Sequence, residues 1–282
     1  MMNPQALLTL LDDTDPVVER ELLNYFTVNN RYEDLVQLEV IKKLVSEDRR
    51  FFYDNLYSLC KSNWFLQNLN AFLEADSLLN LDLLTDVLLG MNVLFDEQYP
   101  VMDGRIALEN LIEDVREVLH PHDDSVDKIS ALNNVIYFKH HFKGNHNKYY
   151  LPENSDLSSL LENKTGIPVS LSLLYYLVAR RCGIDVHPAA LPRHFMLFVS
   201  DPHFLFIDCF NSGNILQPTE VADFLLQINV TEGINTYLYP SGRSVIKRML
   251  QNLVYIYSNA EQHDKLAIIE NLIKKVDSFE AH

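Results

Sequence analysis

A histidine and an aspartate lie in two neighbouring β-rich runs past the middle of this 282-residue chain. His194 opens the run HFMLFV, and Asp208 lies towards the end of FLFIDCF, with a polar turn at 200–203 between them. Two such runs around a turn predict an antiparallel hairpin. His194 and Asp208 then share one edge of the hairpin, where the carboxylate can accept from the imidazole and fix its tautomer.

A helix with a sharp start precedes the two strands. Pro168 suits its first position, because the N–H that proline lacks has no intrahelical partner there. Arg180 and Arg181 favour the last turn, and Gly183 is predicted to end the helix. A helix start in front of a His–Asp pair is the frame that a cysteine acyl-transfer enzyme uses. The same pair can also simply join two strands, so the frame alone does not establish catalysis.

The nucleophile is the uncertain part of this frame. Cys182 lies at the far end of the helix, and Cys209 should point away from Asp208 because side chains alternate along a strand. Ser170 is the nearest hydroxyl to the helix start, but its side chain leaves the helix about 200° away from that of Pro168. Ser170 is therefore either an alternative nucleophile or a small packing or capping residue.

The acidic composition excludes several classes of partner. The net charge is −16, and such a surface repels phosphate backbones, so neither nucleic acid nor a membrane is expected as a direct partner. The N-terminus lacks a secretory signal, no apolar run reaches the length of a membrane span, and three scattered cysteines fit a reducing cytoplasm. The histidines between residues 120 and 146 match no zinc spacing, so no metal or other cofactor is predicted.

Helical patterns dominate the rest of the chain. Residues 1–80 are expected to form a helical N-terminal region with a weak likeness to a HEAT repeat, and residues 81–240 a core that contains the hairpin. Residues 241–282 predict two helices spaced like one tetratricopeptide unit, which must pack on the core because one unit cannot bury both faces alone. The predicted class is α+β, mostly helical, with a small antiparallel sheet.

The helix and the strands belong to a larger set of short motifs. The set includes GIPVSLSLLY at 166–175, LPRHF at 191–195, IDCFNSG at 207–213 and RMLQNL at 248–253. Together these motifs strongly resemble the SirB-type transglutaminase-like proteins of bacteria, over roughly residues 85–275. The resemblance implies a papain-like α+β core followed by tetratricopeptide-like helices.

The resemblance also implies a degenerate active site. Enzymes of the superfamily use a cysteine at a helix N-terminus, a histidine that opens a strand and an aspartate that closes the next one. His194 and Asp208 match the last two positions. When the helix is aligned on Arg180 and Gly183, Pro168 occupies the position of the cysteine. Three further residues are expected along the same cleft: Asn145, Tyr149 and Asn211.

The sequence therefore predicts a cytoplasmic, transglutaminase-like protein without transglutaminase or protease activity. Its function would be to bind a protein or peptide through the old substrate cleft or through the helical surfaces. The alternative is a hydrolase or acyltransferase in which Ser170 is the nucleophile, His194 the base and Asp208 the residue that orients it. A third hypothesis is a helical scaffold in which the His–Asp pair only joins two strands.

Overall fold

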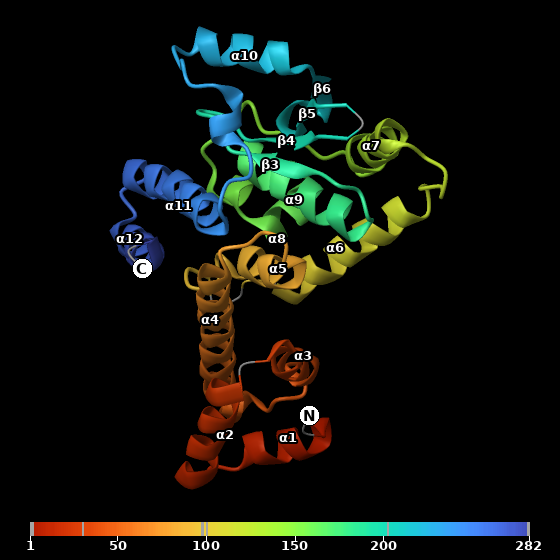
Figure 1. Ribbon diagram of the computed structural model, residues 1–282. Helices are drawn as coiled ribbons and strands as arrows, with labels where there is room; N and C mark the ends of the chain where they lie inside the picture. Colours follow the sequence, from red (N-terminus) through yellow and green to blue (C-terminus); the bar gives the residue numbers. More distant parts are fainter. Residues whose placement is uncertain (1–2, 30, 97–98, 100, 202, 281–282) are drawn as a thin grey trace.

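The computed structural model describes residues 3–29, 31–96, 99, 101–201 and 203–280. Pro202, in the predicted turn between the two strands, thus lies outside the described part. The molecule consists of a small helical lobe and a larger body that contains both sheets (Figure 1). The 26-residue helix α4 (Arg50–Ala75) runs from the lobe to the body. No described helix is both long and apolar enough to cross a membrane.

The lobe packs two short helices, α2 (Pro16–Asn29) and α3 (Tyr32–Ile41), against α4, and a third, α1 (Pro4–Asp12), against those two. Asp15 caps α2 by accepting from the N–H of Val17 at 2.8 Å. Arg49, in the 3₁₀ turn η1 (Glu47–Arg49), donates to the carbonyl of Leu11 at 2.6 Å and so ties α1 to the start of α4.

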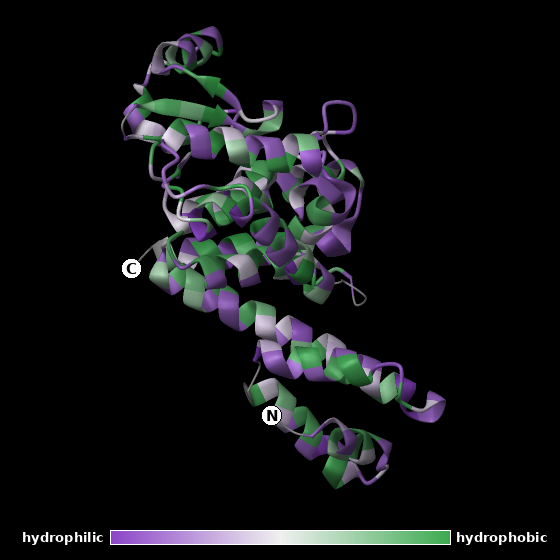
Figure 2. Ribbon diagram, turned by 90° about the vertical axis from the view of Figure 1, so that its right-hand side faces the viewer, coloured by the Kyte–Doolittle hydropathy of each residue, from purple (hydrophilic) through white to green (hydrophobic). Residues whose placement is uncertain are grey.

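The body is built around α9 (Pro168–Arg181), which is buried from its first residue to Ala179. Gly183 ends it with a φ of +74°, a conformation that glycine adopts without strain. Figure 2 shows hydrophobic ribbon concentrated inside the body. The surrounding helices are α5 (Leu81–Gly90), α6 (Val101–Arg116), α7 (Ser125–Asn133), the π-helical turn η2 (Asn134–Lys139) and α8 (Leu157–Asn163).

The main sheet is antiparallel and four-stranded, in the order β3-β4-β5-β6. Its inner strands are the predicted hairpin, with Leu197 opposite Ile207. Leu197 and Ile207 face the main core beside α9, whereas Phe198 and Phe206 pack in a second apolar cluster with α10 (Pro218–Gln227). The bounds are His187–Ala189 for β3, Met196–Val199 for β4, Leu205–Asp208 for β5 and Asn214–Leu216 for β6.

A second, two-stranded sheet joins the loop after η2 to the segment before α9. Strand β1 (Lys143–Gly144) pairs in parallel with β2 (Thr165–Gly166). A Cβ on Gly144 would lie 2.5 Å from the carbonyl oxygen of Phe210, so only glycine allows this approach to the turn after Asp208. The remaining 3₁₀ turns are η3 (Pro152–Ser155), η4 (Cys209–Asn211) and η5 (Ile234–Tyr237).

The chain closes with a helical hairpin of α11 (Gly242–Asn259) and α12 (His263–Glu280), which pack against each other and against α4. Arg243 fastens the hairpin, because its guanidinium donates to the carbonyls of Leu73 and Phe279, each at 2.7 Å. Its backbone N–H also donates to Asp76 at 2.8 Å. The hairpin is therefore an integral wall of the body.

The buried carboxyl group of Asp156, the N-cap of α8, should give the protein an unusual pH dependence of stability. Its Oδ2 accepts from the N–H of Ser159 at 2.7 Å, while Oδ1 is buried without a hydrogen-bond partner among the described residues. Burial raises its pKa from 3.8 to about 6. The folded state therefore keeps a proton that the unfolded state releases between pH 4 and 6, and stability falls as the pH rises through that window.

Asp156→Asn should remove the loss of stability that the native protein shows as the pH rises. Relative to the native protein, the free energy of unfolding of the variant should increase from pH 4 to pH 7 by up to about 3 kcal/mol, as follows from two pKa units. Urea unfolding at both pH values measures it. Asp124→Asn, at the exposed cap of α7, is the matched control for replacing a capping carboxylate. A pH-independent difference for Asp156→Asn would contradict the argument.

Candidate functional site

The structure brings His194 and Asp208 into contact. The His194 Nε2 lies 3.0 Å from Oδ1 of Asp208, and the side chains are only 11% and 7% exposed. Asp208 also accepts from the Asn211 side-chain amide at 2.7 Å and from two backbone N–H groups at 3.2 Å. Burial raises the pKa of Asp208, but His194 and Asn211 lower it by more, so the net pKa lies below its ordinary value. Asp208 is therefore an anion that is already well paired.

The sequence predicts that His194 opens a strand. In the structure it lies two residues before β4. A tight turn causes the difference: Arg193 has a φ of +61°, and the His194 N–H donates to the Leu191 carbonyl at 3.2 Å. Arg248 of α11 then donates to the carbonyls of Leu191 and His194, each at 2.7 Å. The carbonyl of His194 thus bonds to the C-terminal hairpin, so α11 helps to position the imidazole.

The turn that follows Asp208 is held from behind by α7 and η2. Tyr137 donates its hydroxyl to the Cys209 carbonyl at 3.1 Å, and Asn133 donates to the Gly213 carbonyl at 3.0 Å. Cys209 is fully buried in the main core, on the side away from the cleft that Asp208 lines. The π-helical turn, a feature that often occurs at functional sites, therefore supports this edge of the sheet.

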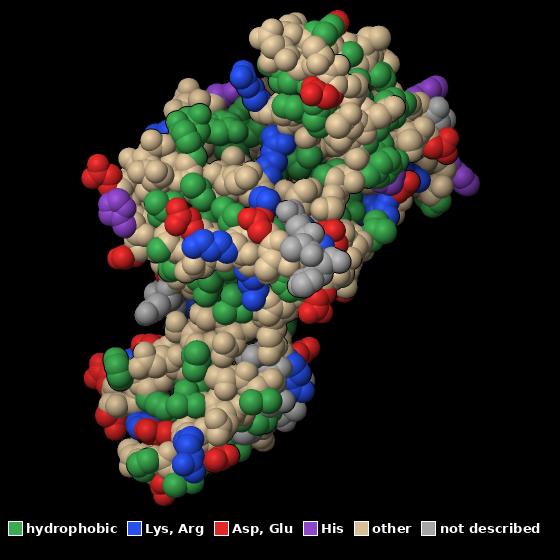
Figure 3. Space-filling model, turned by 60° about the vertical axis from the view of Figure 1, so that its left-hand side comes forward, with side chains coloured by type: hydrophobic (Ala, Val, Ile, Leu, Met, Phe, Trp, Pro, Cys, Tyr) green, Lys and Arg blue, Asp and Glu red, His purple; other side chains and the backbone are tan. Residues whose placement is uncertain are grey.

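A cleft of about 880 Å³ opens beside the His–Asp pair. Aromatic and aliphatic side chains dominate its lining, and the polar groups are few, as in most ligand sites. On the face that carries α11, Figure 3 shows hydrophobic side chains gathered on the body with Lys and Arg among them. The lining comprises Tyr149, Tyr150, Pro168, Arg193, His194, Met196, Asp208, Phe210, Asn211, Leu216, Phe224, Ile228, Asn252 and Tyr255.

Pro168, at the start of α9, lies in this lining together with His194. No cysteine, serine or threonine is among the described residues around the cleft. Cys60 and Cys209 are buried, and burial raises the pKa of each thiol to about 12. The residue that the start of α9 contributes to the lining is thus a proline, whose ring carries no nucleophilic atom.

Ser170 lies inside the protein and not in the described lining of the cleft. Its hydroxyl donates to the Asn154 carbonyl at 2.5 Å and accepts from the Ile167 N–H at 3.1 Å. Among the described residues, no hydrogen bond joins Ser170 to His194. The hydroxyl therefore caps the start of α9 and anchors η3, which matches the capping alternative of the sequence.

The three residues expected along the cleft have different positions. Tyr149 and Asn211 lie in the lining. Asn145 lies outside it, because its amide donates to the Asn154 side chain at 3.0 Å and its oxygen accepts from the Lys148 N–H at 3.0 Å. Asn145 therefore shapes the loop that carries Tyr149. Phe224 and Arg248 were not predicted as site residues, because only the folded chain brings α10 and α11 to the cleft. Arg193 was also missed, although it lies directly before His194 in the sequence.

A comparison with known protein families identifies the superfamily to which this fold belongs. A model of the transglutaminase-like superfamily matches residues 103–251, which is more than half of the chain. The chain belongs to the transglutaminase-like superfamily. The matched range extends from α6 into α11, so this transglutaminase-like region contains α9, both sheets and all of the cleft lining except Asn252 and Tyr255.

Curated relatives share much of this region. A UPF0162 protein from Xylella fastidiosa (strain 9a5c) is 28% identical over 191 residues, which cover 64% of this chain and 68% of that protein. F-box only protein 21 from Mus musculus is 33% identical over 135 residues, 45% of this chain but 21% of that protein. UPF0162 protein BU173 from Buchnera aphidicola is 23% identical over 188 residues, 64% of this chain and 69% of that protein. No solved structure matches the chain.

Proposed function

We propose that this chain is a SirB-type, transglutaminase-like protein that binds a peptide or protein segment in its cleft and does not catalyse acyl transfer. The observation that carries the proposal is Pro168, which lies at the start of α9 in the cleft beside His194. A nucleophile at that point is required to form an acyl-enzyme. The His–Asp pair alone can orient and accept a hydrogen bond, but it cannot take up an acyl group in place of a thiol.

The retained pair has a role in binding. In the tautomer in which Nε2 of His194 donates to Asp208, Nδ1 is an acceptor, and no described residue bonds to it. The rings of Phe210 and Phe224 lie edge-on to the imidazole, with centroids 6.3 and 6.1 Å away. A backbone N–H of a bound peptide fits this apolar surrounding with one fixed acceptor, while the tetratricopeptide-like hairpin forms the opposite wall. The partner is a cytoplasmic protein or peptide.

Turnover assays test the proposal. The protein is incubated with glutamine-containing peptides plus an amine, with peptide substrates and with acyl esters, and products are followed by mass spectrometry. We expect no product above the level seen with His194→Ala. A product that forms with the native protein and disappears in His194→Ala would overturn the proposal.

Ser170→Ala separates the serine-hydrolase alternative from the structural role. We expect it to lower the free energy of unfolding by about 0.5–1.5 kcal/mol, because the Asn154 carbonyl and the Ile167 N–H lose their bonds to the hydroxyl but keep the one between them at 3.3 Å. Urea unfolding measures the change, and Ser130→Ala on the exposed face of α7 is the control. A variant that is as stable as the native protein but loses a measurable activity would favour the serine enzyme.

A further inference from the structure

The cleft continues as a groove along α11. A second hollow of about 370 Å³ shares Tyr150 and Tyr255 with the cleft. A third hollow of about 340 Å³ shares Pro152, Tyr257 and Gln262 with the second. Because each hollow shares lining residues with the next, the three follow one another along α11 from His194 to the start of α12.

An exposed aromatic pair lies in the middle of this path. The rings of Tyr150 and Tyr255 are 4.7 Å apart, and the residues are 59% and 52% exposed. Leu151, beside them, is also 40% exposed. Adjacent exposed tyrosines and an aliphatic side chain suit an extended apolar or proline-rich segment. Such a segment packs on an aromatic groove without the entropy cost of forming a helix.

The cleft end of the groove is cationic in an otherwise acidic protein. The chain has 39 Asp and Glu residues, yet none lies in 139–152, 186–200 or 242–260, three segments that supply much of the cleft wall. Arg193 is exposed in the lining and has no carboxylate partner among the described residues. Arg248 donates to carbonyls only, and Asp208 is already paired with His194. The guanidinium of Arg193 is therefore available to pair with an acidic group of a ligand.

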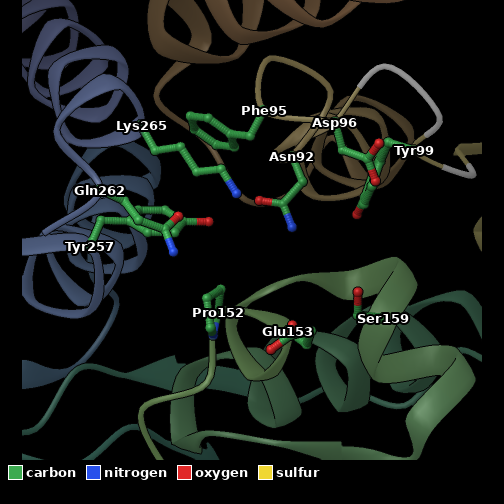
Figure 4. Close-up of a pocket in the computed structure, with 10 residues that line it drawn as sticks. All are labelled: Asn92, Phe95, Asp96, Tyr99, Pro152, Glu153, Ser159, Tyr257, Gln262 and Lys265. Atoms are coloured by element: carbon green, nitrogen blue, oxygen red, sulfur yellow. The ribbon is translucent and has the colours of Figure 1, made fainter. Parts of the chain in front are cut away.

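The far end has the opposite character. Figure 4 shows the hollow between α12 and the η3 segment, with Lys265 on one wall and Glu153 on the other. Asp96 also lines it. Lys265 lies over the ring of Tyr257, 5.3 Å from its centroid, and no cation of the described chain forms an ion pair with Glu153. A basic side chain is the complementary group at this end.

We infer that the groove binds one extended segment of a partner protein, with an acidic residue at Arg193, an apolar centre on Tyr150 and Tyr255, and a basic residue at Glu153. The inference rests on the proposed function and specifies its ligand. A peptide of mixed charge matches both ends, whereas a polyanion would meet Glu153, Asp96 and a net charge of −16.

A peptide library tests this directly. Immobilised full-length protein is exposed to random peptides of about ten residues, acetylated and amidated at their ends, which reach roughly 30 Å when extended. We expect the retained peptides to carry Asp or Glu at one end and Lys or Arg at the other, around apolar residues or proline. Retained peptides without this charge order would overturn the inference.

Three variants then assign the contacts by fluorescence anisotropy with a retained peptide. We expect Arg193→Glu, Tyr255→Ala and Glu153→Gln each to weaken binding at least tenfold, and exchange of the peptide's acidic residue for lysine to restore binding to Arg193→Glu. The controls are Arg20→Glu, Phe51→Ala and Glu117→Gln, which make equivalent changes at exposed positions away from the groove.

The outcomes distinguish a failure of the extended groove from a failure of the proposed cleft function. Binding that depends on Arg193 but not on Tyr255 or Glu153 overturns the extended groove and leaves the proposed cleft function standing. If no peptide is retained, or if retention is the same for native protein and Arg193→Glu, the inference and the proposed function both fail.

Discussion

Pro168→Cys should create a reactive thiol that iodoacetamide alkylates at pH 6 on the order of ten times faster than an ordinary exposed cysteine, because the larger thiolate fraction outweighs the lower intrinsic nucleophilicity of a thiolate of low pKa. A thiol at the start of the 14-residue helix α9, in the same cleft as His194, has the two features that lower a cysteine pKa from about 8.5 to about 6. At pH 6 the thiolate fraction then rises from under about 1% to roughly one half. Mass spectrometry of the modified peptide measures the rate.

The native cysteines leave a low background in this experiment. Cys60 and Cys209 are buried, and burial also raises the pKa of Cys182. Ser170→Cys is the matched control, since it places a thiol two residues along the same helix but inside the protein, and it should react slowly. Adding His194→Ala to Pro168→Cys should remove most of the gain. Equal rates for Pro168→Cys with and without His194 would show that the imidazole does not act on a thiol at position 168.

Among single substitutions near the site but outside the cleft lining, we expect Arg248→Met to destabilise the fold most. It removes two charge-assisted hydrogen bonds, to the carbonyls of Leu191 and His194, while it keeps most of the side-chain volume. We expect the free energy of unfolding to fall by about 3 kcal/mol and the turn that carries His194 to loosen. Urea unfolding gives the stability, and in the Pro168→Cys background the alkylation rate reports the position of the imidazole.

Arg243→Met is the control for this prediction. Arg243 also lies on α11 and also donates to two carbonyls, but those belong to Leu73 and Phe279, outside the cleft. We expect it to cost comparable stability and to leave the thiol of the Pro168→Cys variant reactive. If both arginine variants lower the alkylation rate equally, Arg248 acts on stability alone and does not position His194.

Local rules of sequence were sufficient for the frame of the site. Proline at the first turn and Gly183 after the last fixed the limits of α9, and two β-rich runs around a turn gave the inner hairpin with its His–Asp edge. The outer strands β3 and β6 were not predicted, because three residues each are too few for a pattern of alternation.

The rest of the site depends on contacts between distant segments. Arg248 is 54 residues away from His194 in the chain, and its role comes from a hydrogen bond to a carbonyl, for which a sequence carries no signal. Asn145 is expected in the cleft only from the family resemblance, but its hydrogen-bond partners are in its own loop and in η3. The charge segregation around the cleft was visible in the sequence, yet only the fold shows that the acid-free segments meet.

The central claim, that this cleft binds peptides without transforming them, is tested most directly by one measurement on the peptide library. The library is incubated with native protein or with Asn252→Trp, which fills part of the cleft, and both the retained peptides and their masses are determined by mass spectrometry. The account predicts that the native protein retains peptides with unchanged masses and that Asn252→Trp loses them. Peptides that gain or lose mass with time, in a reaction abolished by His194→Ala, would contradict it.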